Sequence, residues 1–284
     1  MTKLREREAM EAEEARVDIR LTPDLQRPFL LVSWQTRDFG KVASRVMDRL
    51  IEETAGIEVA EIKPQGFFSF GGVRFQNDLV KVPEGIFRAS EKKNLLMLKS
   101  DEPEFEHHQF LTTLLEFAVS HYQVRKIYTL NGTVSFTAHT LPRRILTVFN
   151  QPELKEELHG DGLEALTWEG PPALSSYLLW TARGKGIPAA SLWLEVPFYL
   201  AGGEDPQAIK TALSFLDRRF DLGLDLGSFD GKIRDQSERL SQLRKENVDV
   251  DQWIHLLEAG EMLEEEDQSK LTKEVRDCLS RDKR

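Results

Sequence analysis

Short apolar runs alternate with amphipathic stretches along most of this chain. The first run, Pro28–Trp34 (PFLLVSW), is typical of a strand buried on both faces of a sheet. After it, Val42, Val46 and Leu50 recur at the spacing of one helix face. Similar apolar runs follow at residues 59–62, 94–99, 127–130, 145–149 and 189–196, with helical patterns between several of them. This alternation favours an α/β domain over residues 28–228, with a mostly parallel sheet covered by helices on both faces.

One segment breaks this pattern. Between Gly66 and Ala89, the short alternating runs Val73–Gln76 and Leu79–Val82 flank Asn77-Asp78. A two-residue turn of this type between alternating runs predicts a β-hairpin, either inserted into the main sheet or extending its edge.

The two ends of the chain differ from the α/β region. Residues 1–27 form a charged leader, rich in Glu, Arg and Ala at its start, without the apolar core of a signal peptide. Residues 229–284 show only helical patterns, and they predict a helical tail too small to hold a core alone. Because such a tail must pack on the body or on another subunit, its apolar residues are predicted to make contacts with a partner or a second copy: Leu240, Leu243, Trp253, Ile254 and Leu257.

Charge and cysteine content narrow the classes of partner. The chain has 48 acidic and 38 basic residues, a net charge of −10, which argues against nucleic acid and against an anionic membrane surface. Its single cysteine, Cys278, excludes an internal disulfide and fits a reducing compartment. Because no apolar stretch approaches the roughly 18 residues of a membrane span, we expect a soluble cytoplasmic protein.

Polar residues at the predicted strand ends are the candidate site. In an open parallel sheet, ligands bind beyond the carboxyl ends of the strands. The loops expected there are residues 34–40, 100–105, 131–143 and 195–199. They offer an acid, a histidine, an arginine and aromatics that could hold a small polar ligand: Trp34, Asp38, Gly40, Asp101, Asn131, Gly132, His139, Arg143, Glu195 and Tyr199. Simple solvation of exposed loops is the alternative interpretation.

No motif with catalytic or metal-binding spacing is found. His107 and His108 are adjacent, so on a helix they point about 100° apart, and a solvated helix face explains them better than a metal site. The serines lack the G-x-S-x-G pattern of a hydrolase nucleophile. We therefore predict no metal, no cofactor and no catalytic residue.

The order of segments resembles the proteasome assembly chaperone family in its broad sense, with archaeal and bacterial members. Gly186–Tyr199 is the most specific part. The other matching segments are Trp34 with Asp38, Gly40 and Ala43; Asp101–Pro103; Leu130–Gly132; His139, Pro142 and Arg143; and Glu169–Pro171. The resemblance implies a three-layer α/β/α fold similar to nucleoside phosphorylases, a helical C-terminal extension, homo-oligomers and no demonstrated catalysis.

Two departures from the family pattern bear on function. The loop Trp34–Gly40 is longer and more basic than the short Asp-Ala-Gly turn typical of the family, which puts a ligand site shared with the family in question. The sequence ends Arg281-Asp282-Lys283-Arg284, where some family members carry a hydrophobic-Tyr-any motif that docks on the proteasome ring. We therefore do not expect that mode of docking.

Two functions from different classes remain open. The first is a non-enzymatic, oligomeric protein-binding or assembly-chaperone-like protein, whose partners are itself and possibly another protein. The second is a binding protein or enzyme for a nucleoside-like or other small polar ligand at the strand-end crevice.

Overall fold

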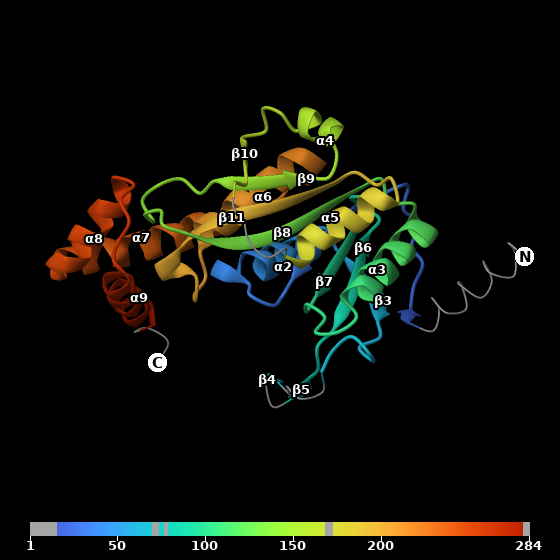
Figure 1. Ribbon diagram of the computed structural model, residues 1–284, viewed down its shortest axis with the longest axis horizontal. Coiled ribbons are helices and arrows are strands. Elements are labelled where there is room, and N and C mark those ends of the chain that lie inside the picture. The colour runs from blue at the N-terminus through green and yellow to red at the C-terminus, as the bar shows by residue number, and fades with distance from the viewer. Residues whose placement is uncertain (1–15, 70–73, 77–78, 168–172, 281–284) are drawn as a thin grey trace, which may run out of the picture.

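A computed structural model of the protein describes residues 16–69, 74–76, 79–167 and 173–280. In this part of the chain, nine strands form one sheet in the order β1-β3-β6-β7-β2-β8-β11-β9-β10 (Figure 1). Their bounds are β1 Val17–Ile19, β2 Phe29–Trp34, β3 Ile57–Ile62, β6 Gly85–Ser90, β7 Leu95–Ser100, β8 Lys126–Ser135, β9 Ile145–Phe149, β10 Leu163–Ala165 and β11 Ala189–Pro197.

The sheet is mixed, so the prediction of a mostly parallel sheet is wrong. Strands β7, β2, β8 and β11 form a parallel central block. On one side, β1, β3 and β6 pair antiparallel with one another and β6 pairs antiparallel with β7; on the other side, β9 pairs antiparallel with β11 and parallel with β10. The unpredicted strand β6 explains one antiparallel pair, because residues 91–94 connect it to β7. A turn this short joins only antiparallel neighbours, since parallel strands need a crossover of about a dozen residues.

Helices cover both faces of the sheet, as predicted. On one face, α3 and α5 share a core with residues from β2, β6, β7 and β8. On the opposite face, α2 and α6 pack in a second core. The helices and short 3-10 turns span η1 Phe39–Lys41, α2 Val42–Glu53, α3 His107–Tyr122, α4 Pro152–Glu157, α5 Leu174–Gly184, η2 Phe198–Leu200, α6 Pro206–Phe220, α7 Ser228–Glu246, α8 Val248–Glu258 and α9 Glu265–Ser280. The three layers are present; the likeness to nucleoside phosphorylases stays a prediction.

The C-terminal helices α7, α8 and α9 form a compact group at one end of the sheet (Figure 1). Their apolar residues join the core that contains α2 and α6, and α9 packs against η2. Four of the five tail residues predicted as partner contacts, Leu240, Leu243, Ile254 and Leu257, are buried inside this chain, whereas Trp253 is partly exposed. The predicted stripes therefore hold the tail on the body.

The two regions with unusual sequence patterns occupy the periphery. Strand β1 lies within the segment expected as a charged leader, and it pairs antiparallel with β3 at the sheet edge. The predicted antiparallel pair is confirmed, since β4 (Arg74–Gln76) pairs with β5 (Leu79–Lys81), but its predicted attachment to the main sheet is wrong. The two strands form a separate sheet that projects from the body (Figure 1). Its predicted turn at residues 77–78 lies outside the described residues. Among the described residues, no helix is long and apolar enough to cross a membrane.

Candidate functional site

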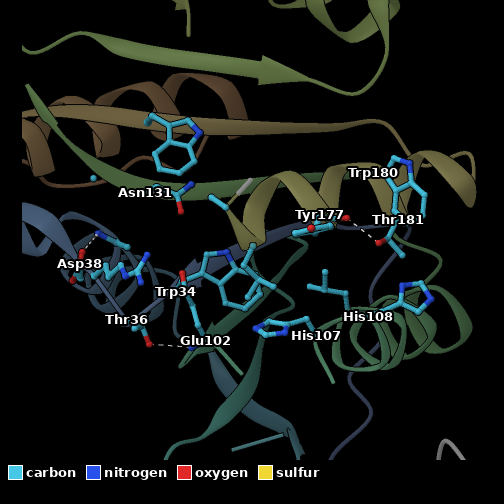
Figure 2. Close-up of a pocket in the computed structure, with 17 residues that line it drawn as sticks. Trp34, Thr36, Asp38, Glu102, His107, His108, Asn131, Tyr177, Trp180 and Thr181 are labelled. Atoms are coloured by element: carbon cyan, nitrogen blue, oxygen red, sulfur yellow. Dashed lines mark hydrogen bonds between the residues drawn. The ribbon is translucent and has the colours of Figure 1, made fainter. Parts of the chain in front are cut away.

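A cavity of about 670 Å³ lies between the α3/α5 layer and the carboxyl end of the parallel block. Figure 2 shows it as an elongated site, with Asp38 and Thr36 towards one end and His108 and Trp180 towards the other. It is lined by Trp34, Thr36, Arg37, Asp38, Ala43, Glu102, His107, His108, Leu111, Asn131, Gly132, Ala173, Leu174, Tyr177, Trp180, Thr181 and Trp193.

The floor of the cavity is a row of three side chains from neighbouring strands. Asn131 of β8 is in register with Trp193 of β11, and Ser33–Leu130 pairing places Trp34 of β2 beside Asn131 on the other side. Residues in register on parallel strands point to the same face of the sheet, which here is the face covered by α5. The row therefore presents an amide between two indoles.

Hydrogen bonds to α5 and to neighbouring hydroxyl groups of the sheet hold the Trp34 and Asn131 side chains of this row in place. The Trp34 indole N–H donates to Ser175 Oγ of α5 at 2.9 Å, and Ser175 Oγ donates to Asn131 Oδ1 at 3.1 Å. Asn131 Nδ2 in turn donates to the hydroxyls of Thr129 and Ser191, both at 3.2 Å. Because the amide oxygen and nitrogen each meet a fixed partner, the orientation of Asn131 is set by the fold.

Close backbone approaches hold the loop after β2 against the sheet. A Cβ atom at Gly132 would overlap the carbonyl oxygen of Phe39, so only glycine fits beneath this loop. Gly40 has φ +63° and lies against Val196, where a side chain would also collide. Of the two predicted glycines, Gly132 lines the cavity, whereas Gly40 lies against residues of the α2/α6 face.

Asp38 serves the fold at the same end. Its carboxylate accepts hydrogen bonds from the backbone N–H groups of Ala43 at 2.8 Å and Ser44 at 3.0 Å, in the first turn of α2. These free N–H groups and the helix dipole favour a negative charge. Burial raises the pKa of Asp38, while the hydrogen bonds from Ser44 and Ala43 oppose that change.

The mouth of the cavity carries charged and aromatic residues that the predicted crevice did not include. Glu102 is half-buried, and burial raises its pKa while the nearby positive charge of Arg37 and His107 lowers it. His107 and His108 are exposed, as expected for a solvated helix face, yet both lie at the rim. Tyr177 and Trp180 of α5 are 50% and 66% exposed.

Three predicted residues lie in a separate cluster on the other face of the sheet. Arg143 Nε donates to Asp205 Oδ2 at 2.8 Å, and both side chains are almost fully buried. Asp205 Oδ1 also caps α6, where it accepts from the backbone N–H of Gln207 and Ala208. Tyr199 packs in the core of the α2/α6 face, and its hydroxyl accepts from the His139 backbone N–H at 2.6 Å and contacts His139 Nδ1 at 2.9 Å.

Burial has opposite consequences for the two titratable rings in this cluster. Burial, helped by Arg143 and Arg244, lowers the pKa of His139 to about 4, whereas burial raises the pKa of Tyr199. Both groups are therefore neutral near pH 7. With its charges paired and its rings in contact, this cluster joins the loop after β8 to η2 and α6, and none of its four side chains lines the cavity on the α3/α5 face.

The last two predicted residues lie outside the cavity lining. Glu195 is two residues beyond Trp193, where Arg144 binds both of its carboxylate oxygens, at 2.6 and 2.8 Å. Asp101 Oδ2 accepts from the Glu84 backbone N–H at 3.3 Å. The ten predicted residues thus divide: Trp34, Asp38, Asn131 and Gly132 line the cavity, and the other six do not. A ligand-binding role for the four stays a prediction.

The structure adds three groups that sequence reasoning missed: Ser175, Trp193 and the aromatic pair on α5. Trp193 could have been predicted as a site residue, because it lies in a predicted buried strand, two residues before the predicted site residue Glu195. No sequence pattern marks Ser175 as a site residue, since its role depends on how α5 packs over Trp34 of β2 and Asn131 of β8. The described residues contain no group of three His, Cys, Asp or Glu side chains that could hold a metal ion.

Known proteins share sequence features and the fold of this chain. Residues 35–244 match the PAC2 family, which is most of the chain. The chain belongs to the PAC2 family. This confirms the resemblance to proteasome assembly chaperone homologues. A search of curated proteins finds none that matches.

Solved structures of PAC2 relatives share the fold. A PAC2 family protein from Streptomyces avermitilis has 24% identity and a TM-score of 0.67, over 76% of this chain and 95% of that one. A proteasome-assembly chaperone homologue from Mycobacterium tuberculosis has 16% identity and a TM-score of 0.68, over 80% and 99%. PbaB of Pyrococcus furiosus, an archaeal proteasome activator, has 20% identity and a TM-score of 0.65, over 80% and 98%. At these identities the likeness concerns the fold.

Proposed function

We propose that this PAC2 protein is a non-enzymatic, cytoplasmic protein-binding factor that associates with copies of itself and with a partner protein. The observation that carries this proposal is the exposed aromatic pair Tyr177 and Trp180 on α5. They are three positions apart on one helix, so they lie on the same side of α5, and both line the cavity mouth; this pair is the aromatic surface of the protein. Tryptophan and tyrosine are the residues most enriched among those that dominate protein interfaces.

Two of its structural relatives are described as a proteasome-assembly chaperone homologue and a proteasome activator. A chaperone homologue or activator works through contacts with other proteins, which supports the same class of function here. The partner of this chain is proposed only as a protein with a complementary apolar surface.

The pairing of polar groups in the cavity supports binding rather than turnover. Ser175 donates its proton to the amide oxygen of Asn131, and a nucleophilic serine would instead donate to a base. The carboxylate of Asp38 accepts from two backbone amides of α2. Both groups are therefore engaged in holding the fold.

The proposed contact surface lies on α5, whereas the sequence pattern predicted contacts through the tail. The tail leucines and Ile254 are buried in the chain's own core, so a truncation near Ser228 would expose that core and would not test self-association. Trp253 is partly exposed and remains a secondary candidate contact.

The decisive experiment removes the aromatic surface and leaves the rest of α5 intact. Multi-angle light scattering would compare the wild-type chain, a Tyr177→Ser/Trp180→Ala double variant, and Arg183→Ala as a control on an exposed residue of the same helix. We expect the wild type and the control to exceed the 32.6 kDa mass of one chain, and the double variant to approach it. Equal masses for the wild type and the double variant would contradict self-association through α5.

Binding to a different protein is tested with the same variants. A tagged chain is used to capture proteins from its own cells, followed by mass spectrometry. The proposal is supported only by a protein that the wild type and Arg183→Ala capture and that the double variant does not.

The cavity favours a second function, binding of a small polar ligand. The observation that favours it is the fixed row of Trp34, Asn131 and Trp193 along the floor. This function concerns the inside of the cavity, whereas protein binding concerns its outer rim.

A further inference from the structure

Polar side chains lie in the centre of the sheet, beneath the cavity, where apolar side chains are usual. Thr129, Asn131 and Ser191 are in the central strands β8 and β11, which are covered by helices on both faces and whose other positions are mainly apolar. A buried polar group costs free energy unless it is hydrogen-bonded, and a complete network fixes its members in one arrangement. Here the network ends at the two groups that face the cavity, the Asn131 amide and the Trp34 indole. The floor is therefore organised before any ligand arrives.

The two indoles of the floor flank the amide. Neighbouring strands lie about 4.8 Å apart, so the backbones that carry Trp34 and Trp193 are about 10 Å apart, with Asn131 midway between them. Trp34 is only 3% exposed and closes the floor of the cavity, whereas Trp193 is half-buried and offers more of its ring surface to a ligand. An aromatic face beside an oriented amide suits a flat ring with heteroatoms at its edge, because the ring stacks on the indole while its edge meets the amide.

The charges around the cavity decide between a neutral ring and a cation. Aromatic side chains with a free carboxylate would favour an ammonium ion. Here the Asp38 carboxylate is engaged by the amides of α2, and the cation Arg37 lines the same cavity as Glu102. Burial raises the pKa of Glu102, and the charge of Arg37 opposes that change. Because Arg37 offsets the charge of Glu102, the lining favours a neutral ring over a cation.

We propose that the cavity binds a small, neutral, flat heteroaromatic molecule, with its ring against Trp193 and its polar edge towards Asn131. This inference rests on the second proposed function, small-ligand binding, and is independent of protein contacts through α5. The volume of about 670 Å³ exceeds that of one or two fused rings, so a polar substituent reaches the mouth beside Arg37 and His107.

Isothermal titration calorimetry with adenine and indole as flat heteroaromatic probes tests the proposal. Choline, a quaternary ammonium ion, and ribose, a polar non-aromatic molecule, are the comparison probes. We expect saturable binding of adenine or indole to the wild type, binding at least tenfold weaker to Trp193→Leu, and binding within a few-fold of wild type to Trp193→Phe, which keeps an aromatic face. Phe220→Leu is the matched control, because Phe220 is also a partly buried aromatic residue but lies in α6 on the opposite face of the sheet, and it should bind like the wild type.

The outcomes separate this proposal from the two functions above. Saturable binding of choline or ribose without binding of adenine or indole would overturn the flat-ring inference and leave small-ligand binding standing. Binding of none of the four would overturn both. Heteroaromatic binding that survives Trp193→Leu, with native circular dichroism, would place the ligand elsewhere and overturn the site. A change of oligomeric mass in the α5 double variant concerns protein binding alone.

Discussion

Two clusters of polar side chains lie at the carboxyl end of the same parallel strands, on opposite faces of the sheet. On the α2/α6 face, Arg143 and Asp205 form a buried ion pair beside the His139–Tyr199 contact. On the α3/α5 face, Ser175 and Asn131 belong to a network of neutral groups beside an open cavity. Sequence reasoning placed members of both in a single crevice, and the sheet separates them.

The two clusters show two uses of buried polar side chains: one stabilises the fold, and the other holds side chains that line the cavity. In the first cluster each charged or titratable group is matched by another side chain, and the cluster links a loop to the start of α6. In the second cluster the groups are neutral, and their hydrogen bonds orient an amide and an indole towards empty space. We expect stability to depend mainly on the first cluster and ligand binding on the second.

The largest effect on stability is expected from Arg143→Met. It leaves the carboxylate of Asp205 buried without its cation, which costs about 3–5 kcal/mol of unfolding free energy. Urea denaturation measures it. Arg45→Met is the control, because Arg45 pairs with Glu204 at 3.0 Å but is half exposed, and it should cost less than about 1 kcal/mol. Similar losses for the two variants would contradict the structural role of the buried pair.

A pH effect of intermediate size is expected from His139. Its pKa is lowered by burial, then by Arg143 and Arg244, from 6.5 to about 4, so the folded chain resists protonation that the unfolded chain accepts. Stability is therefore complete above pH 6.5 and falls as the pH drops from 6.5 towards 4. At about 1.4 kcal/mol per tenfold change in proton affinity, the loss is at most about 3.5 kcal/mol.

Unfolding by urea at several pH values between 4 and 7 tests this expectation. His139→Gln should have a flatter dependence of stability on pH than the wild type, whereas His159→Gln, on an exposed residue, should follow the wild type. Parallel curves for the wild type and His139→Gln would show that the buried ring does not control this pH range.

The smallest effect is expected on the cavity side, from Ser175→Ala. It removes the acceptor of the Trp34 indole and the donor to Asn131, and it should cost about 1–2 kcal/mol. Ser176→Ala, on the exposed neighbour, should change stability by less than about 0.5 kcal/mol. Thermal and urea unfolding give the two values. If Ser175→Ala loses as much as Arg143→Met, the distinction between the two clusters fails.

Much of the fold could be predicted from local patterns. The apolar runs identified the parallel strands β2, β7, β8 and β11, and helical spacing identified the helices that cover them. The antiparallel pairs could not be predicted in the same way. Strand β1 has three residues, β6 follows a hairpin whose relation to the sheet was left open, and the apolar runs of β3 and β9 do not show the direction in which these strands pair. Pairing direction depends on the connections between strands, and periodicity carries little information about it.

Three of the four correctly predicted lining residues, Trp34, Asn131 and Gly132, belong to strands. Asn131 and Trp34 lie within strands, so their alternation fixes the face to which they point. His139 and Tyr199 lie in the loop after β8 and in η2, where alternation no longer applies. The partner of Arg143 is Asp205, 62 positions later, and no local pattern connects the two residues.

The shared core between the tail and the α/β body has a consequence for how the protein opens. Leu271 and Val275 of α9 belong to the same buried cluster as residues of α2 and α6, and Thr140 of the body donates to Glu258 of α8 at 2.8 Å. Regions that share one core open together. Amide protons in α9 should therefore exchange with solvent as slowly as those of α6, and a protease would remove the tail only after the body had begun to unfold.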